Sequence, residues 1–487
     1  MSQEIRNLEP KALWNQFADL NAVPRPSKKE EQVIQFMKDF GNRLGLETFE
    51  DEIRNVIIRK PATPGMENRK PIVLQGHLDM VHQKNNDTVF DFETQGIEMY
   101  VDGDWVRAKG TTLGADNGLG VAAIMAVLES TDIPHPAIEA LFTIDEETGM
   151  TGALNLQGGI LQGQILLNLD TEEDDEIDIG CAGGIDVTAT AEYDEEDTPE
   201  GSVGYSITVK GLQGGHSGMD IHKGLGNANK IMNRLLFDGF DNFGLQIASI
   251  AGGSLRNAIP RESVAKVIIA EVYDEAFVFD MQQIVNEIKA EFKTTEPNLE
   301  IGFEKLKTTP KKVMPSIAQF YFVRSMYTAH NGVYRMSADF DNLVETSNNI
   351  AKVIVGEGQL TVQCLTRSSV ESSKMDLANA LRSAFELMGC EVEFSGAYPG
   401  WTPNPKSEIL DVLVGIYEKQ NNAKPNVVAC HAGLECGILG TNYPEMDMIS
   451  FGPTIHGAHS PDERASISSS QKFWKFFLEI LASIPAK

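Results

Sequence analysis

Runs typical of buried strands alternate with helical runs through the first 190 residues. The short β-rich runs NVIIRK and PIVLQGH are followed by the helical run NGLGVAAIMAVLES, the strand-like AIEALFTIDEE, and QILLNLD after another helical segment. This alternation is typical of α/β folds, in which a sheet is covered by helices. Ligands of such sheets bind beyond the carboxyl ends of the strands. The sequence therefore predicts an α/β domain with its site at one edge of a mixed sheet.

Other elements follow from local signals. A helix is expected over residues 28–43, because Ser27 and Glu30 form a capping-box pattern and apolar residues follow at helical spacing. Further helices are predicted near 406–420 and 467–483, and short strands near 426–429 and 446–450.

At 487 residues the chain is too long for a single core. After about residue 186 an acidic stretch, EYDEEDTPEGS, leads into two successive rounds of strands with helices. The α/β pattern returns from Trp401. We therefore expect one α/β domain in two segments, 1–186 and 398–487, interrupted by an α+β insert over 187–397. The two rounds predict an insert of two similar halves.

The net charge of −29 narrows the range of partners and locations. Such an acidic chain repels phosphate backbones and anionic lipid, so neither nucleic acid nor a membrane surface is expected as a partner. We find no secretory leader pattern and no run of about 18 apolar residues. Five scattered cysteines without a CxxC pair fit a reducing compartment and argue against a sulfur-based zinc site. A cytoplasmic protein is expected.

Acidic and imidazole side chains follow the predicted strands directly. His77 and Asp79 end the run VLQGHLD, Glu146 and Glu147 follow a second strand, and Asp170 ends a third. Side chains at positions i and i+2 of a strand point to the same face, so His77 and Asp79 emerge together. We expect these side chains to meet at the carboxyl edge of the sheet.

Two further motifs complete the set, since LGADNGLG supplies Asp116 and GAHSPDE supplies His459. Carboxylates mixed with imidazoles suit zinc, manganese or cobalt, whereas calcium prefers oxygen ligands alone. Two histidines and three carboxylates match a pair of ions about 3.5 to 4 Å apart that one carboxylate bridges. The set therefore predicts a dinuclear hydrolase site. Spacing alone leaves His456 open as the alternative to His459.

The motifs GHLDMV, ADNGLG, DEETG, GGHSG and HSPDE occur in this order along nearly the entire chain. In them the sequence resembles the co-catalytic zinc exopeptidases of the aminoacylase and glutamate carboxypeptidase superfamily. Within that superfamily it is most similar to the aminoacyl-histidine dipeptidases, through the long insert and the stretch HAGLECG at 431–437. The resemblance implies a di-zinc exopeptidase domain interrupted by a lid domain. It also implies a cytosolic dipeptidase that hydrolyses Xaa-His dipeptides, including β-alanyl-histidine.

The resemblance further implies a role for each matching residue. Two divalent ions, Zn²⁺ or else Mn²⁺ or Co²⁺, would be held by His77, Asp116, Glu147, Asp170 and His459. Asp116 would bridge the ions and would be joined to Asn117 by a cis peptide. Asp79 would orient the imidazole of His77, and Glu146 would be the general base.

Four residues outside the metal set are expected to bind the substrate. His216 in GGHSG would stabilise the oxyanion, as the matching lid histidine does in related enzymes. Asn257 in RNAIP and Arg367 in CLTRSS match lid positions that hold the substrate, and Arg367 would clamp its C-terminal carboxylate. We further expect Glu435 in HAGLECG to pair with the free α-amino group, which would limit substrates to dipeptides.

Several alternatives stay open. No residue pattern indicates an imidazole pocket, so a broad di- or tripeptidase and an N-acyl amino-acid deacylase fit the same motifs. A metal-containing peptide-binding protein without catalysis is a further alternative, and the presence of Glu146 beside a complete ligand set speaks against it. A monomer with a duplicated lid would let His216 act in cis, whereas a homodimer would let it act across the dimer. The sequence does not fix the native metal.

Overall fold

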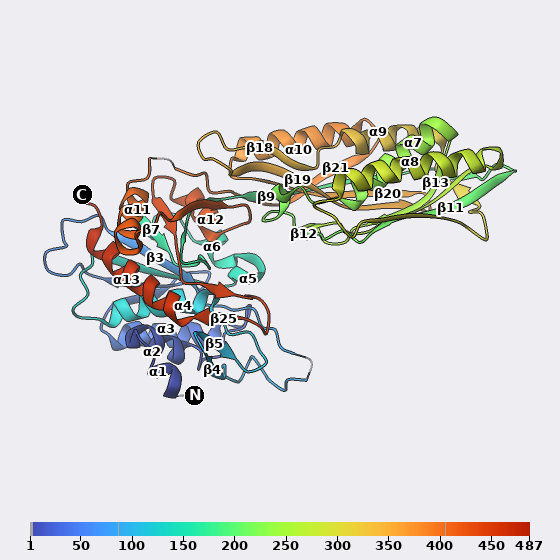
Figure 1. Ribbon diagram of the computed structural model, residues 1–487. Helices are drawn as coiled ribbons and strands as arrows, with labels where there is room; N and C mark the ends of the chain where they lie inside the picture. The colour runs from blue at the N-terminus through green and yellow to red at the C-terminus, as the bar shows by residue number, and fades with distance from the viewer. Residues whose placement is uncertain (1–2, 86, 405) are drawn as a thin grey trace. The chain divides into compact units, whose positions relative to one another are not determined.

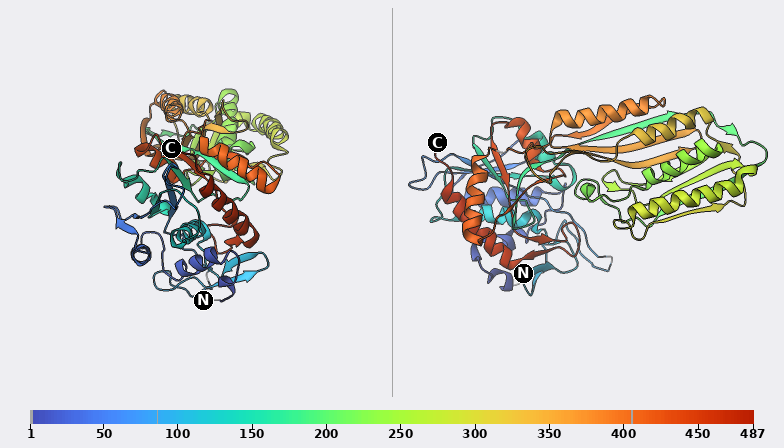
Figure 2. Two further views of the ribbon diagram at one scale, coloured as in Figure 1. Left: turned by 90° about the vertical axis from the view of Figure 1, so that its left-hand side faces the viewer. Right: turned by 45° about the horizontal axis from the view of Figure 1, so that its top comes forward.

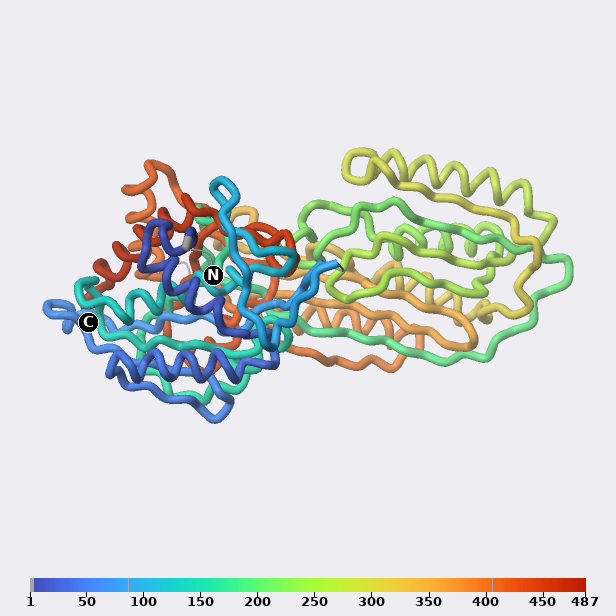
Figure 3. Tube along the Cα trace, turned by 90° about the horizontal axis from the view of Figure 1, so that it is seen from below, coloured from blue at the N-terminus to red at the C-terminus, as the bar shows by residue number. Residues whose placement is uncertain are grey.

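The structure is a computed structural model that describes residues 3–85, 87–404 and 406–487. This part of the chain divides into compact units (Figure 1). The first unit comprises Met1–Gly180, Trp401–Ala429 and Leu434–Lys487, and the second unit comprises Cys181–Gly400 and Cys430–Gly433. The blue N-terminal and red C-terminal parts of the trace lie together in the first unit (Figure 3). We propose that these units are the α/β domain and the insert expected over 1–186 with 398–487 and over 187–397.

A mixed sheet forms the centre of the first unit, with the strand order β1-β2-β6-β3-β7-β23-β8-β22. Its strands are β1 (Glu47–Glu50), β2 (Val56–Lys60), β3 (Ile72–His77), β6 (Ile138–Thr143), β7 (Ile165–Asn168), β8 (Glu176–Cys181), β22 (Asn426–Cys430) and β23 (Asp447–Ser450). β3 runs parallel to β6 and β7, and β7 runs parallel to β23. Every residue of β3, β6 and β7 is buried, because helices cover both faces of a parallel sheet.

Helices pack on both faces of this sheet. On one face, α6 (Thr151–Asn155) and α12 (Glu435–Asn442) share a core with Val73, Leu141 and Leu166. On the other face, α4 (Ala115–Glu129) packs against β3, and α2 (Lys11–Leu20) packs against α4. α4 is apolar on all sides because it is enclosed in this way.

The remaining elements of the first unit surround this core. They are α1 (Gln3–Arg6), α3 (Glu31–Arg43), α5 (Glu146–Gly149), α11 (Glu408–Asn421), α13 (Ile467–Ser483) and a small sheet in the order β24-β25-β5-β4, with β4 (Met99–Asp102), β5 (Trp105–Ala108), β24 (Ile455–His456) and β25 (Arg464–Ser466). Among the described residues, no helix combines the length and the apolar character needed to span a membrane.

The helix predicted over residues 28–43 is α3, which begins at Glu31. The capping-box prediction is wrong, because the N-cap residue of this helix is Glu30 and its side chain makes no capping hydrogen bond with the described residues. Ser27 Oγ instead donates to the Met80 carbonyl at 3.2 Å, and Glu30 Oε1 accepts from the Asp145 N–H at 3.1 Å. These contacts tie the start of α3 to the loops that follow β3 and β6.

An antiparallel sheet forms the second unit, and long helices lie side by side over one of its faces (Figures 1 and 2). The strand order is β16-β11-β15-β13-β19-β20-β9-β21, and β18 pairs with β19. The strands are β9 (Gly183–Glu192), β11 (Ser202–Lys210), β13 (Gln246–Gly252), β15 (Ser263–Ala270), β16 (Glu300–Lys305), β18 (Gly332–Met336), β19 (Val344–Gly356), β20 (Gln359–Ser368) and β21 (Glu391–Tyr398). The helices are α7 (Ala228–Phe243), α8 (Asp274–Phe292), α9 (Ser316–Thr328) and α10 (Glu371–Glu386). That the unit consists of two similar halves stays a prediction.

Two short strand pairs complete the second unit. β10 (Glu196–Asp197) pairs with β17 (Lys312–Val313), and β12 (Gly215–His216) pairs with β14 (Ala258–Ile259).

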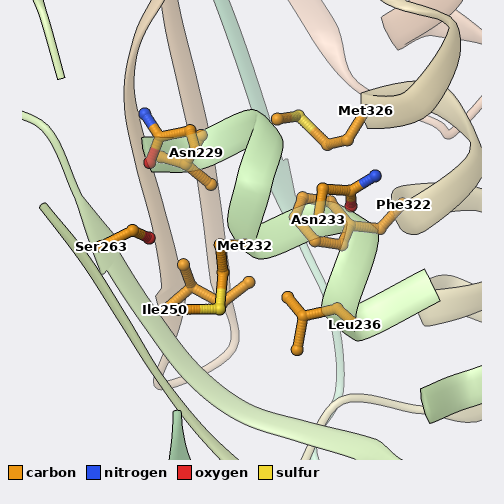
Figure 4. A pocket seen from close by; sticks show the side chains of 9 residues that line it. Asn229, Met232, Asn233, Leu236, Ile250, Ser263, Phe322 and Met326 are labelled. Atoms are coloured by element: carbon orange, nitrogen blue, oxygen red, sulfur yellow. The ribbon is translucent and has the colours of Figure 1, made fainter. Parts of the chain in front are cut away.

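A small cavity lies in the core of the second unit, beside α7 and α9 (Figure 4). Its volume is about 10 Å³. Asn229, Asn233 and Ser263 line it, and each has a buried oxygen without a hydrogen-bond partner among the described residues. A space of this size holds no more than one water molecule, so this cavity is not a substrate pocket.

Candidate active site

The loops that follow adjacent parallel strands carry several of the predicted metal ligands. β3 ends at His77, β6 ends just before Glu146, and β7 ends just before Asp170. β3 lies between β6 and β7 and is parallel to both, so these loops emerge at the same edge of the sheet. Asp116 comes from the start of α4, and His459 comes from the loop between β24 and β25.

Asp116 lies between two groups of candidate ligands. Its Oδ1 is 3.2 Å from His77 Nε2, and its Oδ2 is 3.2 Å from His459 Nε2. In the group around His77, Asp170 Oδ1 is 3.5 Å from His77 Nε2. In the group around His459, Glu147 Oε2 is 3.0 Å from His459 Nε2. The ligand atoms within each group lie within 4.8 Å of one another. Groups that share one carboxylate in this way suit a pair of bridged cations.

Glu146 adjoins the same cluster. Its Oε2 is 3.9 Å from His77 Nε2, and it forms a further candidate group with His77 and Glu147. Asp145, just before it, has a left-handed backbone with φ 51° and makes the sharp turn from β6 into α5. This turn places two adjacent glutamates at the cluster.

Asp79 connects the imidazole of His77 to the glutamate pair. Its Oδ1 is 3.4 Å from His77 Nδ1, which leaves Nε2 directed at the other ligands. The same carboxylate accepts the backbone N–H of Glu146 at 3.0 Å and that of Glu147 at 3.3 Å. A carboxylate in this place fixes the orientation of a metal-binding histidine.

The cluster perturbs the pKa values of its members strongly. Burial raises the pKa of Glu146 well above its ordinary value, and the charge of Asp170 adds to this shift while His77 opposes it. Burial also raises the pKa of Asp170. Burial by itself would lower the pKa of His77, but the carboxylates of Asp170 and Asp116 raise it well above the ordinary value. A hydrogen bond to Asp116 is the largest cause that raises the pKa of His459 to about 11.

The donor set fits divalent cations. Asp170 Oδ1 is buried and, apart from His77 Nε2 at 3.5 Å, has no hydrogen-bond partner among the described residues, and a buried carboxylate oxygen with so few partners is costly. None of the candidate groups found in the described residues includes a cysteine. Carboxylate oxygens mixed with imidazole nitrogens suit zinc, manganese or cobalt better than calcium. A cation in each group would offset the excess of negative charge.

His456 faces a different partner from His459. Its Nε2 is 3.3 Å from Glu173 Oε1, and its ring centre is 5.2 Å from that of Trp105. The geometry therefore favours His459 over His456 as a ligand.

Glu435, the first residue of α12, contacts residues near the carboxyl ends of β3 and β6. Its Oε2 accepts from Gln75 Nε2 at 2.6 Å and from Thr143 Oγ1 at 2.7 Å. Its Oε1 is buried without a hydrogen-bond partner among the described residues. Burial raises the pKa of this carboxyl group to about 7. Glu435 is thus held by the same strands that lead to His77 and Glu146.

The predicted lid residues belong to the second unit. His216 pairs with Ala258 across β12 and β14, and Asn257 directly precedes β14. His216 Nδ1 accepts the backbone N–H groups of Gly218 at 3.2 Å and Met219 at 3.1 Å. Burial lowers the pKa of His216, so the neutral ring carries its proton on Nε2. That nitrogen can donate a hydrogen bond.

Arg367 is a buried cation in β20 of the second unit. Its Nη1 donates to the Tyr398 hydroxyl at 2.8 Å. Its Nε is buried and has no hydrogen-bond partner among the residues that the structure describes. An unpaired donor on a buried guanidinium suits the binding of an anionic group.

Two buried residues that no sequence argument selected also adjoin the first-unit cluster. Arg25 bonds the carbonyls of Leu78 and Asp79, and Glu463 bonds the backbone N–H of Asp116. The only sequence signal was that Glu463 ends the motif HSPDE. Arg25 lies in none of the motifs, so local patterns could not have identified it.

Comparisons with known proteins identify the family and the relatives of this chain. The profile of Peptidase family M20/M25/M40 matches residues 73–483. The cytosol non-specific dipeptidase of Escherichia coli (strain K12) is 44% identical over 488 residues, which cover 99% of this chain and 100% of that protein. The crystal structure of aminoacylhistidine dipeptidase from Vibrio alginolyticus is 44% identical with a TM-score of 0.95, and covers 100% of this chain and 99% of that one.

A more distant structure shares only the fold. Aminopeptidase PepT from Bacillus cereus is 16% identical with a TM-score of 0.57, over 98% of this chain and 99% of that one. The α/β fold expected from the sequence is confirmed, as is the resemblance to metallo-exopeptidases. The profile match and the identity over the full length show that the chain belongs to Peptidase family M20/M25/M40.

Proposed function

We propose that this protein is a metal-dependent dipeptidase that hydrolyses Xaa-His dipeptides, including β-alanyl-histidine. The observation that carries the proposal is the pair of ligand groups that share Asp116, with Glu146 beside them. The relatives at 44% identity are a non-specific dipeptidase and an aminoacylhistidine dipeptidase, which supports the reaction and the substrate class. The first of them is a cytosolic protein, which supports a cytoplasmic location.

Two divalent ions, most simply Zn²⁺, would occupy the ligand groups, and Mn²⁺ or Co²⁺ would suit the same donors. One ion would be held by His77 and Asp170, the other by Glu147 and His459, and both by Asp116. When bound, such ions polarise the scissile carbonyl and lower the pKa of water in the site.

Glu146 is the general base of the proposed reaction. Its carboxylate takes a proton from the attacking water and delivers that proton to the amine nitrogen of the leaving amino acid. Asp79 supports this step by holding the His77 imidazole and the Glu146 backbone in one hydrogen-bond system.

Four residues are proposed to bind the dipeptide. His216 donates from Nε2 to the oxyanion, while Asn257 and Arg367 hold the substrate, with the guanidinium on its C-terminal carboxylate. Glu435 accepts a hydrogen bond from the free α-amino group. Arg367 Nε and Glu435 Oε1 support these assignments, because neither atom has a hydrogen-bond partner in the part of the chain that the structure describes. Recognition of both charged ends would restrict substrates to dipeptides.

A broad-specificity dipeptidase is the second candidate, and the non-specific relative from Escherichia coli favours it. Steady-state kinetics distinguishes the Xaa-His dipeptidase from the broad-specificity dipeptidase. The value of kcat/KM of the metal-loaded protein is measured on Xaa-His dipeptides, Xaa-Leu dipeptides and N-acetyl amino acids. A preference for Xaa-His of about tenfold or more supports the first proposal. Equal values for Xaa-His and Xaa-Leu favour the second, and hydrolysis of the N-acetyl compounds alone would indicate a deacylase.

A further inference from the structure

We infer that Arg25 and Glu463 are positioning residues that hold three ligand-bearing loops together. These loops are residues 77–80 from the last residue of β3 onward, residues 113–117 at the start of α4, and residues 457–463 between β24 and β25. The inference rests on the proposed function, because it assigns the two residues to the metal site proposed above. Neither residue would touch metal or substrate, so each acts through the residues it holds.

Glu463 binds the loop at the start of α4 from one side. Its Oε2 accepts from the Leu113 N–H at 2.7 Å and the Gly114 N–H at 3.0 Å. Its Oε1 accepts from the Ala115 N–H at 2.7 Å and the Asp116 N–H at 3.3 Å. Glu463 is only 2% exposed. One carboxylate therefore ties the loop that carries His459 to the backbone of Asp116.

Arg25 binds the same loop through a carbonyl. Its Nη2 donates to the Gly114 carbonyl and to Asn21 Oδ1. Its Nη1 donates to the carbonyls of Leu78 at 3.1 Å and Asp79 at 3.0 Å, in the loop that follows His77. Arg25 is only 1% exposed, so these hydrogen bonds are shielded from water. Arg25 thus joins the His77 loop to the Asp116 loop.

The glycines of LGADNGLG make room for this guanidinium. A Cβ on Gly114 or on Gly118 would lie 2.6 Å from Arg25 Nη2, which is closer than atoms pack. Gly114 also has φ +68°, a conformation that other residues rarely adopt. Gly114 and Gly118 of the motif that supplies Asp116 therefore leave the space that the Arg25 side chain occupies.

The backbone at Asp116 depends on hydrogen bonds from other parts of the chain, because the regular geometry of α4 does not extend to this residue. Asp116 has φ −79° and ψ 114°, and Asn117 has φ −96° and ψ 29°, so neither is helical. Asp116 contacts both His77 and His459. A small rotation of its backbone would consequently move both oxygens of the carboxylate and disturb both ligand groups at once.

Metal binding by the full-length protein tests this inference without relying on activity. Zn²⁺ affinity is measured by competition with a chromophoric chelator, and the geometry at the site is followed by the visible absorption of the Co²⁺-loaded protein. We expect Glu463→Gln to weaken Zn²⁺ binding about 10- to 100-fold and to alter the Co²⁺ spectrum, because the amide offers one acceptor oxygen instead of two. Arg25→Lys, which cannot span both loops, should act in the same direction.

Glu139→Gln is the matched control. Glu139 is a 7% exposed carboxylate of the same unit that accepts the backbone N–H groups of Gln162 at 2.6 Å and Gly163 at 2.9 Å. These hydrogen bonds do not involve any of the three loops. The substitution of Glu139 should therefore leave the Zn²⁺ affinity and the Co²⁺ spectrum unchanged. Unfolding midpoints of the metal-free variants show how much each change costs the fold itself.

The outcomes separate the inference from the proposed function. Failure of the unaltered protein to bind Zn²⁺, Mn²⁺ or Co²⁺ would overturn the proposed function and this inference with it. Zn²⁺ binding by the unaltered protein, with the same affinity and spectrum in Glu463→Gln and Arg25→Lys, would overturn the inference alone. If Glu463→Gln does not fold, Arg25→Lys and Glu463→Asp carry the same comparison.

Discussion

Replacement of Glu435 by Gln should weaken the binding of dipeptides without loosening the fold. Glu435 Oε2 accepts hydrogen bonds from Gln75 and Thr143, and an amide oxygen can keep both. The atom that changes is Oε1, which is buried without a hydrogen-bond partner in the described part of the chain. The substitution therefore removes the negative charge proposed to face the substrate and keeps the existing contacts.

The expected loss follows from one charged hydrogen bond. Such a bond contributes about 1.5 to 3 kcal/mol, and about 1.4 kcal/mol corresponds to a factor of ten. The value of kcat/KM for leucyl-histidine should therefore fall about 10- to 150-fold in Glu435→Gln. The analogue 4-methylpentanoyl-histidine has the same side chain without the amino group, so its binding should change less than about threefold.

Steady-state kinetics of the metal-loaded protein measures both compounds at one pH. If the analogue is not hydrolysed, its inhibition constant against leucyl-histidine gives its affinity. Glu139→Gln, at the other end of β6, is the control for loss of a buried carboxylate. An equal loss for leucyl-histidine and its analogue would refute the assignment of Glu435 to the amino group.

Three further predictions concern catalysis and stability. Glu146→Ala should lower kcat about 10²- to 10⁴-fold and leave Zn²⁺ affinity nearly unchanged; an unaltered kcat would contradict the role of general base. Phe477→Ala removes a 0% exposed ring and should cost about 3 to 5 kcal/mol in urea unfolding, whereas Val272→Ala, at a site 83% exposed, should stay within about 0.5 kcal/mol. Burial, with the charge of Arg367, lowers the pKa of His431 from 6.5 to about 3. The unfolded chain therefore binds a proton that the folded protein excludes, and the unfolding free energy should fall as the pH drops from 6.5 toward 3. Urea unfolding at pH 7 and pH 5 should show a smaller fall for His431→Gln, and an equal fall in both proteins would contradict this cause.

Elements with a strong local pattern could be predicted from the sequence. The terminal helix α13 occupies Ile467–Ser483, the range that its apolar spacing indicates. β3 ends at His77, the histidine that closes the predicted buried strand. The cis peptide between Asp116 and Asn117, implied by the resemblance alone, is present. Apolar spacing sufficed for α13, because the buried face of a helix repeats at a fixed spacing, and the cis peptide followed from the motif match.

Elements that depend on contacts distant in sequence could not be predicted. Ser27 and Glu30 form a capping pattern, yet their side chains bond the loops after β3 and β6 instead of the helix. Arg25 bonds residues that lie 53, 54 and 89 positions away, and no local signal encodes such pairings. Glu463 accepts from the N–H of Leu113, which lies 350 positions away in the sequence. Tertiary hydrogen bonds of this kind arise only once the sheet has brought the loops to one edge.

The most direct test of the account is metal-restored hydrolysis. The metal-stripped protein is assayed on β-alanyl-histidine and leucyl-histidine before and after addition of Zn²⁺, Mn²⁺ or Co²⁺, with Glu146→Ala beside it. The account predicts that activity is lost on stripping, returns as about two ions bind per chain, and stays about 10²- to 10⁴-fold lower in metal-loaded Glu146→Ala. Full activity in the stripped protein, or restoration of the unaltered protein's full activity in Glu146→Ala, would contradict it.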